Sequence, residues 1–197
     1  MAVDGPAGTG KSTVARRLAA SLGAQYLDTG AMYRAAALGV LRAGIDPAES
    51  AAVVDEVARR HIEVGTEPAS SIVLLVAQQR RIISKATTAA GGIVVEGRDI
   101  GTVVAPDAPL KVFLTATAPA RAARRAAQHG IADVAAVRAA VERRDRYDAR
   151  REASPMCPAE DAVELDTTAL DVDAVLARLH DLAVARGLVV PAVRDPL

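Results

Sequence analysis

The sequence predicts an α/β fold in which a five-stranded parallel sheet is flanked by helices. Three observations carry this prediction. Short apolar runs alternate with longer stretches of helical periodicity along the 197 residues. The first apolar run leads directly into a glycine-rich turn and a helix. Polar residues follow several of the apolar runs, and ligands bind beyond the carboxyl ends of strands in sheets of this kind.

The expected strands are short and mostly apolar, and helical patterns separate them. The strands cover Ala2–Asp4, Gln25–Asp28, Ile93–Glu96, Leu110–Thr115 and Ala162–Asp166. The helices cover Lys11–Leu22, Ala31–Ala43, Pro47–Arg60, Ile72–Ala90, Pro119–Gln128, Val134–Arg151 and Val172–Arg186. Glycines end the first two helices, and an Asp-Pro pair signals the start of the third. Residues 45–92 and the arginine-rich residues 118–151 have the character of insertions.

The composition indicates a single domain and narrows its function. Hydrophobic residues make up 51% of the chain, enough for one core over residues 1–197. The 24 basic and 24 acidic side chains cancel, which argues against a general nucleic-acid binder because phosphate backbones attract basic surfaces. The single cysteine excludes an internal disulfide, and the histidines show no metal-ligand spacing. No signal peptide or membrane-length apolar run is visible, so we expect a cytoplasmic protein, without a membrane partner and monomeric.

The stretch DGPAGTGKST has the spacing of a phosphate-binding loop: Gly5, four residues, then Gly10, Lys11 and Ser12. Small residues let backbone N–H groups turn towards an anion, and the following helix adds partial positive charge. Lys11 would reach the β- and γ-phosphates, and the Ser12 hydroxyl would bind Mg²⁺. The alternative is a plain turn and helix cap. We expect ATP to be bound by Gly5, Pro6, Ala7, Gly8, Thr9, Gly10, Lys11, Ser12 and Thr13.

Polar groups also follow the second and third expected strands. Thr29 opens a helix whose N–H groups would hold an anion, and Arg34 follows about one turn later. The alternative is that Thr29 only caps the helix and Arg34 is solvated. After the third strand, Arg98 and Asp99 reach the same edge of the sheet, with a surface ion pair as the alternative.

A third polar group lies on a helical pattern near residue 148. Arg144, Asp148 and Arg151 are spaced by four and three residues, so they share one helical face. Two guanidinium groups and a carboxylate on one face would suit a phosphate and a sugar hydroxyl. The alternative is a solvated, salt-bridged helix.

Nearly all of the positive charge is arginine, which binds phosphate with two hydrogen bonds at once, although a genomic bias would explain the same counts. Arg121, Arg124 and Arg125 lie near the start of a helix, where the helix dipole disfavours cations. They indicate a mobile phosphate-gripping lid, with a solvated face as the alternative. Arginines on both sides of a triphosphate suit phosphoryl transfer, which needs alignment, charge neutralisation and exclusion of water. This favours a small-molecule kinase over a switch GTPase, whose N-K-x-D pattern is missing.

Together the motifs resemble the bacterial cytidylate kinase family, within the nucleoside-monophosphate kinase fold. The resemblance rests on DGPAGTGKST, LDTGAMYR, VEGRDIGTVV followed by PDAPLKVFLTA, RRDRYDARREASP and ELDTT, in the family's order over most of the chain. It implies Mg²⁺-dependent phosphoryl transfer from ATP to CMP or dCMP, with 45–92 as the acceptor-binding insert and 118–151 as the helical lid. The alternatives are a kinase for UMP or a non-nucleotide acceptor, and a nucleotide-dependent switch or binding protein.

The resemblance also implies roles for individual residues. The acceptor-phosphate contacts correspond to Thr29, Arg34, Arg98 and Arg151, a cytosine contact to Asp99, and ribose-side contacts to Arg144 and Asp148. The lid corresponds to Arg121, Arg124 and Arg125, and the ATP side includes Arg124, Asp166 and Thr167. The expected catalytic groups are Lys11, Arg98, Arg121, Arg125 and Arg151.

The chain departs from the family pattern at two places. The first strand begins almost at the phosphate loop, so we expect it to be short. After EVGTEPAS the sequence passes directly to SIVLLVAQQRR, where the family has a longer segment with a serine and an arginine that contact cytosine. The expected arginine position holds Ile72 or has no counterpart. Either base recognition has been lost, or the printed sequence omits a segment near Pro68–Ser71.

Overall fold

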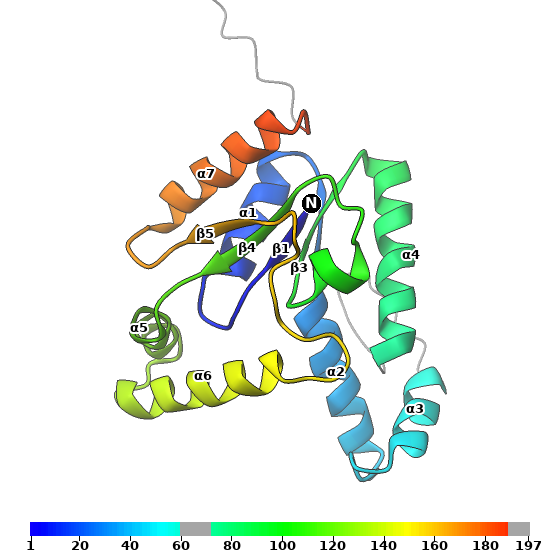
Figure 1. Ribbon diagram of the computed structural model, residues 1–197. Helices are drawn as coiled ribbons and strands as arrows, with labels where there is room; N and C mark the ends of the chain where they lie inside the picture. Colours follow the sequence, from blue (N-terminus) through cyan, green and yellow to red (C-terminus); the bar gives the residue numbers. More distant parts are fainter. Residues whose placement is uncertain (60–71, 189–197) are drawn as a thin grey trace, which may run out of the picture.

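The computed structural model of the chain describes residues 1–59 and 72–188 and contains one five-stranded parallel sheet (Figure 1). The strand order is β2-β3-β1-β4-β5, so the first strand lies at the centre. The strands are β1 (Ala2–Asp4), β2 (Gln25–Asp28), β3 (Ile93–Glu96), β4 (Lys111–Thr115) and β5 (Val163–Asp166). The predicted five-stranded parallel sheet is therefore confirmed, including the short first strand.

The register of the strands brings their carboxyl ends to one edge. Val3 pairs with Glu96 on one side and Val112 on the other, and Asp28 pairs with Glu96. At the far side of the sheet Thr115 pairs with the last residue of β5. Because all pairings are parallel, the loops that follow these strands leave the sheet at the same edge, which is where a ligand binds in such folds.

Helices cover both faces of the sheet. They are α1 (Lys11–Ser21), α2 (Thr29–Arg42), α3 (Ser50–Arg59), α4 (Ile72–Ala90), α5 (Ala118–His129), α6 (Val134–Ala149) and α7 (Val172–Ala185), with a short π-helical turn, η1 (Ile100–Val104), after β3. Figure 1 shows α1 and α7 together on one face and α4 on the other.

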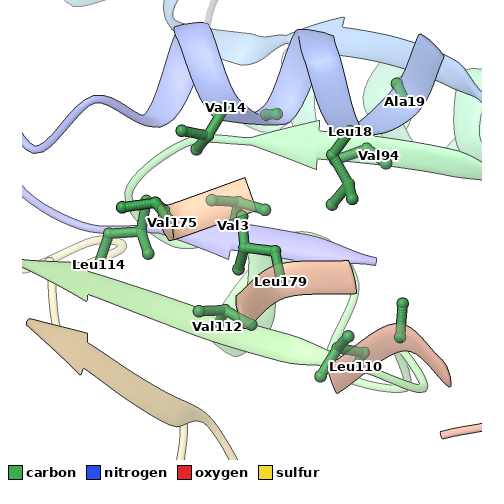
Figure 2. Packing of buried hydrophobic residues seen from close by; sticks show 12 residues of the cluster. Val3, Val14, Leu18, Ala19, Val94, Leu110, Val112, Leu114, Val175 and Leu179 are labelled. Atoms are coloured by element: carbon green, nitrogen blue, oxygen red, sulfur yellow. The ribbon is translucent and has the colours of Figure 1, made fainter. Parts of the chain in front are cut away.

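The alternation of side chains along β1 explains these two layers. Val3 points to the face covered by α1 and α7, where Figure 2 shows it among Leu179, Val112 and Leu114. Ala2 belongs to the core of the opposite face, which α2, α4 and η1 cover with residues such as Met32, Leu75 and Ile100. Successive strand residues point to opposite faces, so a three-residue strand contributes to both cores.

The start predicted for the third helix is wrong, whereas the prediction that Thr29 opens the second helix is confirmed, although the apolar pattern places its first residue at Ala31. The third helix begins at Ser50 and not at Pro47, because the Asp46 carboxylate accepts a hydrogen bond from the Ala48 N–H and holds a turn before it. The second helix begins at Thr29, and its cap is Asp28, whose carboxylate accepts from the Ala31 N–H at 2.9 Å. The other expected elements match to within about two residues, and η1 was not predicted.

The two expected insertions contain helices in the described part of the chain. Residues 45–92 include α3 and α4, and residues 118–151 include α5 and α6, which pack through small apolar side chains such as Ala122 and Val141. The boundaries of an insert and a lid remain predictions. The expected omission near Pro68–Ser71 falls outside the described residues. No helix in residues 1–59 and 72–188 is long and apolar enough to cross a membrane.

Candidate active site

The phosphate loop lies at the carboxyl end of β1 and leads into α1. Gly5, Gly8 and Gly10 all have positive φ angles, of 139°, 84° and 93°. A Cβ at Gly5 would lie 2.1 Å from the Leu114 carbonyl oxygen, so no other residue fits there. The spacing predicted from the sequence thus produces a tight backbone loop against β4, and Gly10 directly precedes the helix as its cap.

Lys11 is buried at the centre of this loop. Its Nζ donates to the Pro6 carbonyl at 2.7 Å. Burial first, and the nearby Arg98 charge second, lower the pKa of Lys11 to about 7. Ser12 and Thr13, the next two residues, are exposed. A buried ammonium group facing a single carbonyl oxygen can be stabilised further by an anion.

Two buried acids lie beside the lysine and were given no site role by the sequence analysis. Asp4 accepts hydrogen bonds from the N–H groups of Ile100 and Gly101 at 2.9 and 2.7 Å, and burial raises its pKa to about 6. Glu96 accepts from the Tyr26 hydroxyl at 2.6 Å. Both charges act on Lys11. The signal that could have found them is an acid that ends an apolar strand next to the phosphate loop.

A cluster of arginines surrounds Asp148, where the acceptor side of the site is expected. Asp148 is 1% exposed and accepts from Arg98 Nε at 2.7 Å and from Arg151, while Arg144 Nε lies 3.7 Å away. The three side chains predicted to share one helical face do meet, but α6 ends at Ala149, so Arg151 reaches Asp148 from the chain that follows the helix. The burial of Asp148 excludes a solvated position for this carboxylate. The cluster carries three guanidinium groups and one carboxylate, so it has an excess of positive charge.

Arg98 connects this cluster to the phosphate loop. Besides its bond to Asp148, its Nη1 donates to the Gly5 carbonyl at 3.0 Å. Arg98 is 18% exposed, so most of the side chain is fixed between the two regions. Arg98 lies at the carboxyl edge of the sheet, as expected. The alternative of a surface ion pair is wrong, because its partner Asp148 is buried.

The other expected acceptor contacts differ in their surroundings. Thr29 is buried and its hydroxyl donates to the Glu96 carbonyl at 2.7 Å, so its role towards a phosphate remains a prediction. Arg34 is 67% exposed and reaches Asp28 at 3.1 Å. Asp99 is buried, burial raises its pKa, and its Oδ2 has no hydrogen-bond partner in the described structure.

The side of the loop where ATP contacts are expected is held by hydrogen bonds to backbone carbonyls. Arg121 is buried, donates to the carbonyls of Ala116 and Ala7 at 2.9 and 3.1 Å, and pairs with Asp145 at 2.6 Å. The solvated-face alternative is therefore wrong for Arg121. Gly8 passes directly over the Arg121 backbone, where a Cβ would meet its carbonyl oxygen at 2.9 Å. The start of α5 is thus fastened to the phosphate loop.

Arg124 and Thr167 lie together, as the expected ATP contacts require. Arg124 donates to the Thr167 carbonyl and hydroxyl and to the Leu170 carbonyl, and the Thr167 hydroxyl lies 3.2 Å from the Thr9 carbonyl. Asp166 accepts from the N–H and hydroxyl of Thr168, and these bonds lower its pKa. Arg125 is half-buried, and its charge acts on Arg144 across the site.

This fold and this site define a phosphate-loop nucleotide-binding protein of the kinase class, with one arginine group on each side of the loop. The chain belongs to the cytidylate kinase family: the model of that family, "Cytidylate kinase", matches residues 1–84 and 69–184.

Curated relatives with this name come from several bacteria. The cytidylate kinase of Rhodococcus opacus is 48% identical over 91% of this chain and 92% of its own length. That of Mycobacterium leprae is 45% identical over 95% and 96%, and that of Corynebacterium glutamicum is 46% identical over 94% of each. The first alignment spans 210 positions although this chain has 197 residues, so the relative contains positions without a counterpart here.

Solved structures support the fold alone. An uncharacterised protein from Eubacterium ventriosum superposes with a TM-score of 0.55 at 14% identity, over 93% of this chain and 97% of its own. A sugar kinase from Janibacter superposes with a TM-score of 0.50 at 16% identity, over 94% and 95%.

Proposed function

We propose that this protein transfers the γ-phosphoryl group of ATP to CMP or dCMP and releases ADP and CDP or dCDP. The observation that carries the proposal is Arg98, which binds the phosphate loop through Gly5 and the acceptor-side cluster through Asp148. A kinase must place the donor and acceptor phosphates next to each other in a fixed orientation. One partly buried side chain that joins both regions supports such an alignment.

Lys11 and the arginine cluster supply the electrostatics of the transfer. The triphosphate would replace the Pro6 carbonyl as the partner of Lys11 Nζ, and its negative charge favours the charged lysine. An oxygen of the acceptor phosphate attacks the γ-phosphorus as the bond to the bridging oxygen of ADP breaks. The acceptor phosphate is already an anion, so the reaction needs no general base. Arg98 and Arg151 would hold that anion in line, and Arg121 and Arg125 remain proposed contacts on the other side.

The residues at the start of α1 fit a magnesium ion carried by ATP. Ser12 presents an exposed hydroxyl next to the buried Lys11. No group of three or more His, Cys, Asp or Glu side chains that could hold a metal occurs in residues 1–59 and 72–188. Mg²⁺ commonly binds through substrate phosphates, water and one or two protein oxygens, so a single hydroxyl suffices. When bound, the ion would neutralise charge on the phosphoryl oxygens.

Cytosine recognition is proposed on the acceptor side. Asp99 offers a buried carboxylate oxygen without a partner, which could accept from the exocyclic amine of cytosine but not from the carbonyl of uracil. Arg144 and Asp148 are proposed to face the sugar. The proposal places the protein in pyrimidine metabolism in the cytoplasm, acting as a monomer.

The test measures ADP release from Mg-ATP with CMP, dCMP, UMP, AMP or no acceptor, side by side, using protein from the complete gene. Turnover with CMP and dCMP far above the other acceptors is expected. Equal turnover with UMP would support the kinase activity but contradict the proposed recognition of cytosine. ADP release that needs no acceptor would move the protein to the switch class and overturn the proposal.

A further inference from the structure

Gln79 lies on α4 with a fully buried side chain, and neither of its amide atoms has a hydrogen-bond partner in the described structure. Buried polar groups are nearly always hydrogen-bonded, because leaving one unpaired costs its desolvation free energy. An apolar side chain of the same shape would avoid this cost. Gln79 is therefore a candidate for a group that gains its partner only in another state of the protein.

Tyr33 packs against the face of α4 that carries Gln79, because Leu75, Ile82 and Ile83, three and four residues from Gln79, belong to the same apolar cluster as Tyr33. Burial raises the pKa of Tyr33 most strongly, the Asp99 charge raises it further, and the Gln79 amide counteracts both. The amide is thus close to the phenol, yet the two do not meet with hydrogen-bond geometry. Their helices, α2 and α4, are in contact, and Tyr33 packs on the same apolar cluster as Leu75.

A second unpaired group borders the same tyrosine. The Oδ2 atom of Asp99 is buried without a partner in the described structure, and the charges of Asp99 and Arg151 both act on the Tyr33 hydroxyl. Arg151 in turn binds Asp148, the centre of the acceptor-side cluster. Two buried side chains with unused hydrogen-bonding groups therefore flank one aromatic ring on the acceptor side.

We propose that Gln79 is a positioning residue for the acceptor nucleotide: when the acceptor binds, the Gln79 amide N–H donates a hydrogen bond to the Tyr33 hydroxyl oxygen and so fixes the ring as a wall of the base site beside Asp99. This inference rests on the proposed function. Because Gln79 is fully buried, it acts through Tyr33 and does not touch the nucleotide. The amide gains its hydrogen bond only when the acceptor is bound. The free energy of this bond therefore stabilises the bound state of the protein relative to the empty state.

The test compares the wild type with Gln79→Leu, Tyr33→Phe and the double variant. Steady-state kinetics give KM for CMP and ATP, and thermal unfolding gives Tm without nucleotide. Gln79→Leu removes both amide atoms at similar volume, so we expect a Tm above that of the wild type. We expect KM for CMP to rise about tenfold, with kcat and KM for ATP within twofold. The double variant should be no worse than either single variant, because both remove the same interaction.

The matched control is Gln78→Leu, one position earlier on α4, which should keep KM for CMP within twofold. An unchanged KM for CMP in Gln79→Leu would overturn the inference, as would a strictly additive double variant. An equal rise in KM for ATP would also overturn it, because that pattern indicates a packing defect. If the wild type itself used no acceptor, the proposed function would fall as well; an active wild type with an unaffected Gln79→Leu removes only the role of Gln79.

Discussion

The two sides of the phosphate loop are built differently. On the ATP side, Arg121 and Arg124 donate to backbone carbonyls, including that of Ala7 in the loop itself. On the acceptor side, three guanidinium groups surround the one carboxylate of Asp148, and Asp99 keeps an unpaired buried oxygen. On the first side the arginine donors are paired with carbonyl groups of the protein, and the second side has more cationic than anionic groups.

This difference indicates which side is preformed. Backbone carbonyls belong to the fold and hold α5 and the β5–α7 turn in place whether or not a nucleotide is bound. A single carboxylate cannot neutralise three arginines, so a phosphate anion has a favourable place beside them. Arg98 belongs to both sides, and the contrast therefore predicts that variants will separate ATP effects from acceptor effects except at Lys11 and Arg98.

The largest effect is expected at the centre of the loop. Lys11→Ala removes the buried ammonium group that would stabilise the transferring phosphoryl group, so kcat should fall by about 10²–10³-fold or more. The fold should survive, because burial already disfavours the charged form of Lys11 and its one hydrogen bond is to the Pro6 carbonyl. Activity assays together with circular dichroism check both points. Near-normal turnover in a folded variant would contradict the assignment of the site.

Asp148→Ala should affect the acceptor side only. The substitution leaves the guanidinium groups of Arg98, Arg144 and Arg151 without their buried carboxylate. We therefore expect the free energy of unfolding to fall by about 2–3 kcal/mol. This is below the usual cost of breaking a buried pair because Arg144 and Arg151 are partly exposed. KM should rise unequally for CMP and dCMP, since the carboxylate is proposed to face the sugar. Equal rises for both would remove that role, and a rise for ATP would break the comparison.

The pH dependence of ATP binding tests whether Lys11 takes up a proton when the triphosphate binds. Burial lowers the pKa of Lys11 to about 7 in the ligand-free site, and a bound triphosphate raises it by favouring the charged form. Above pH 7, binding must therefore take up a proton, and ATP affinity should fall by up to about tenfold per pH unit as the pH rises. Calorimetry at pH 8 in two buffers with different ionisation heats measures this uptake. Identical heats and a pH-independent affinity would show that Lys11 is already charged.

Arg124→Ala should have a smaller effect, limited to the ATP side. It removes donors to the Thr167 and Leu170 carbonyls, which should cost about 1–3 kcal/mol of unfolding free energy and raise KM for ATP a few-fold. Arg17→Ala is a control, since its ion pair with Asp173 is exposed and contributes at most about 1 kcal/mol. A KM for CMP that rises as much as that for ATP would contradict the separation of the two sides.

Local signals in the sequence were sufficient for most of the architecture. The strands, the glycine loop and the proximity of Arg144 to Asp148 follow from periodicity and spacing, which the structure confirms. Arg151 also reaches Asp148, but from beyond the end of α6. The turn η1 could not be predicted, because it depends on the Asp4 carboxylate, which accepts from Ile100 and is 96 residues away in sequence. Its residues are mostly β-branched and carry no helix signal of their own.

The site also depends on contacts between distant residues that local sequence patterns do not predict. Spacing could place Arg121 and Arg98 near the phosphate loop, but only tertiary contacts reveal that the first is buried against Ala7 and the second joins Gly5 to Asp148. Gln79 carries no motif in the sequence, and it stands out only because the fold buries it without a partner. Sequence patterns predict which residues share an edge, whereas burial and pairing decide what each of them can still bind.

The central claim is that the γ-phosphoryl group moves directly from ATP to the acceptor phosphate. Phosphorus NMR of Mg-ATP mixed with CMP and wild-type protein follows this group by its chemical shift. We expect the lost γ-signal to be matched by new ADP and CDP signals, with no inorganic phosphate. Release of inorganic phosphate with CMP unchanged would contradict direct transfer, because the γ-phosphoryl group would then have gone to water and not to the acceptor.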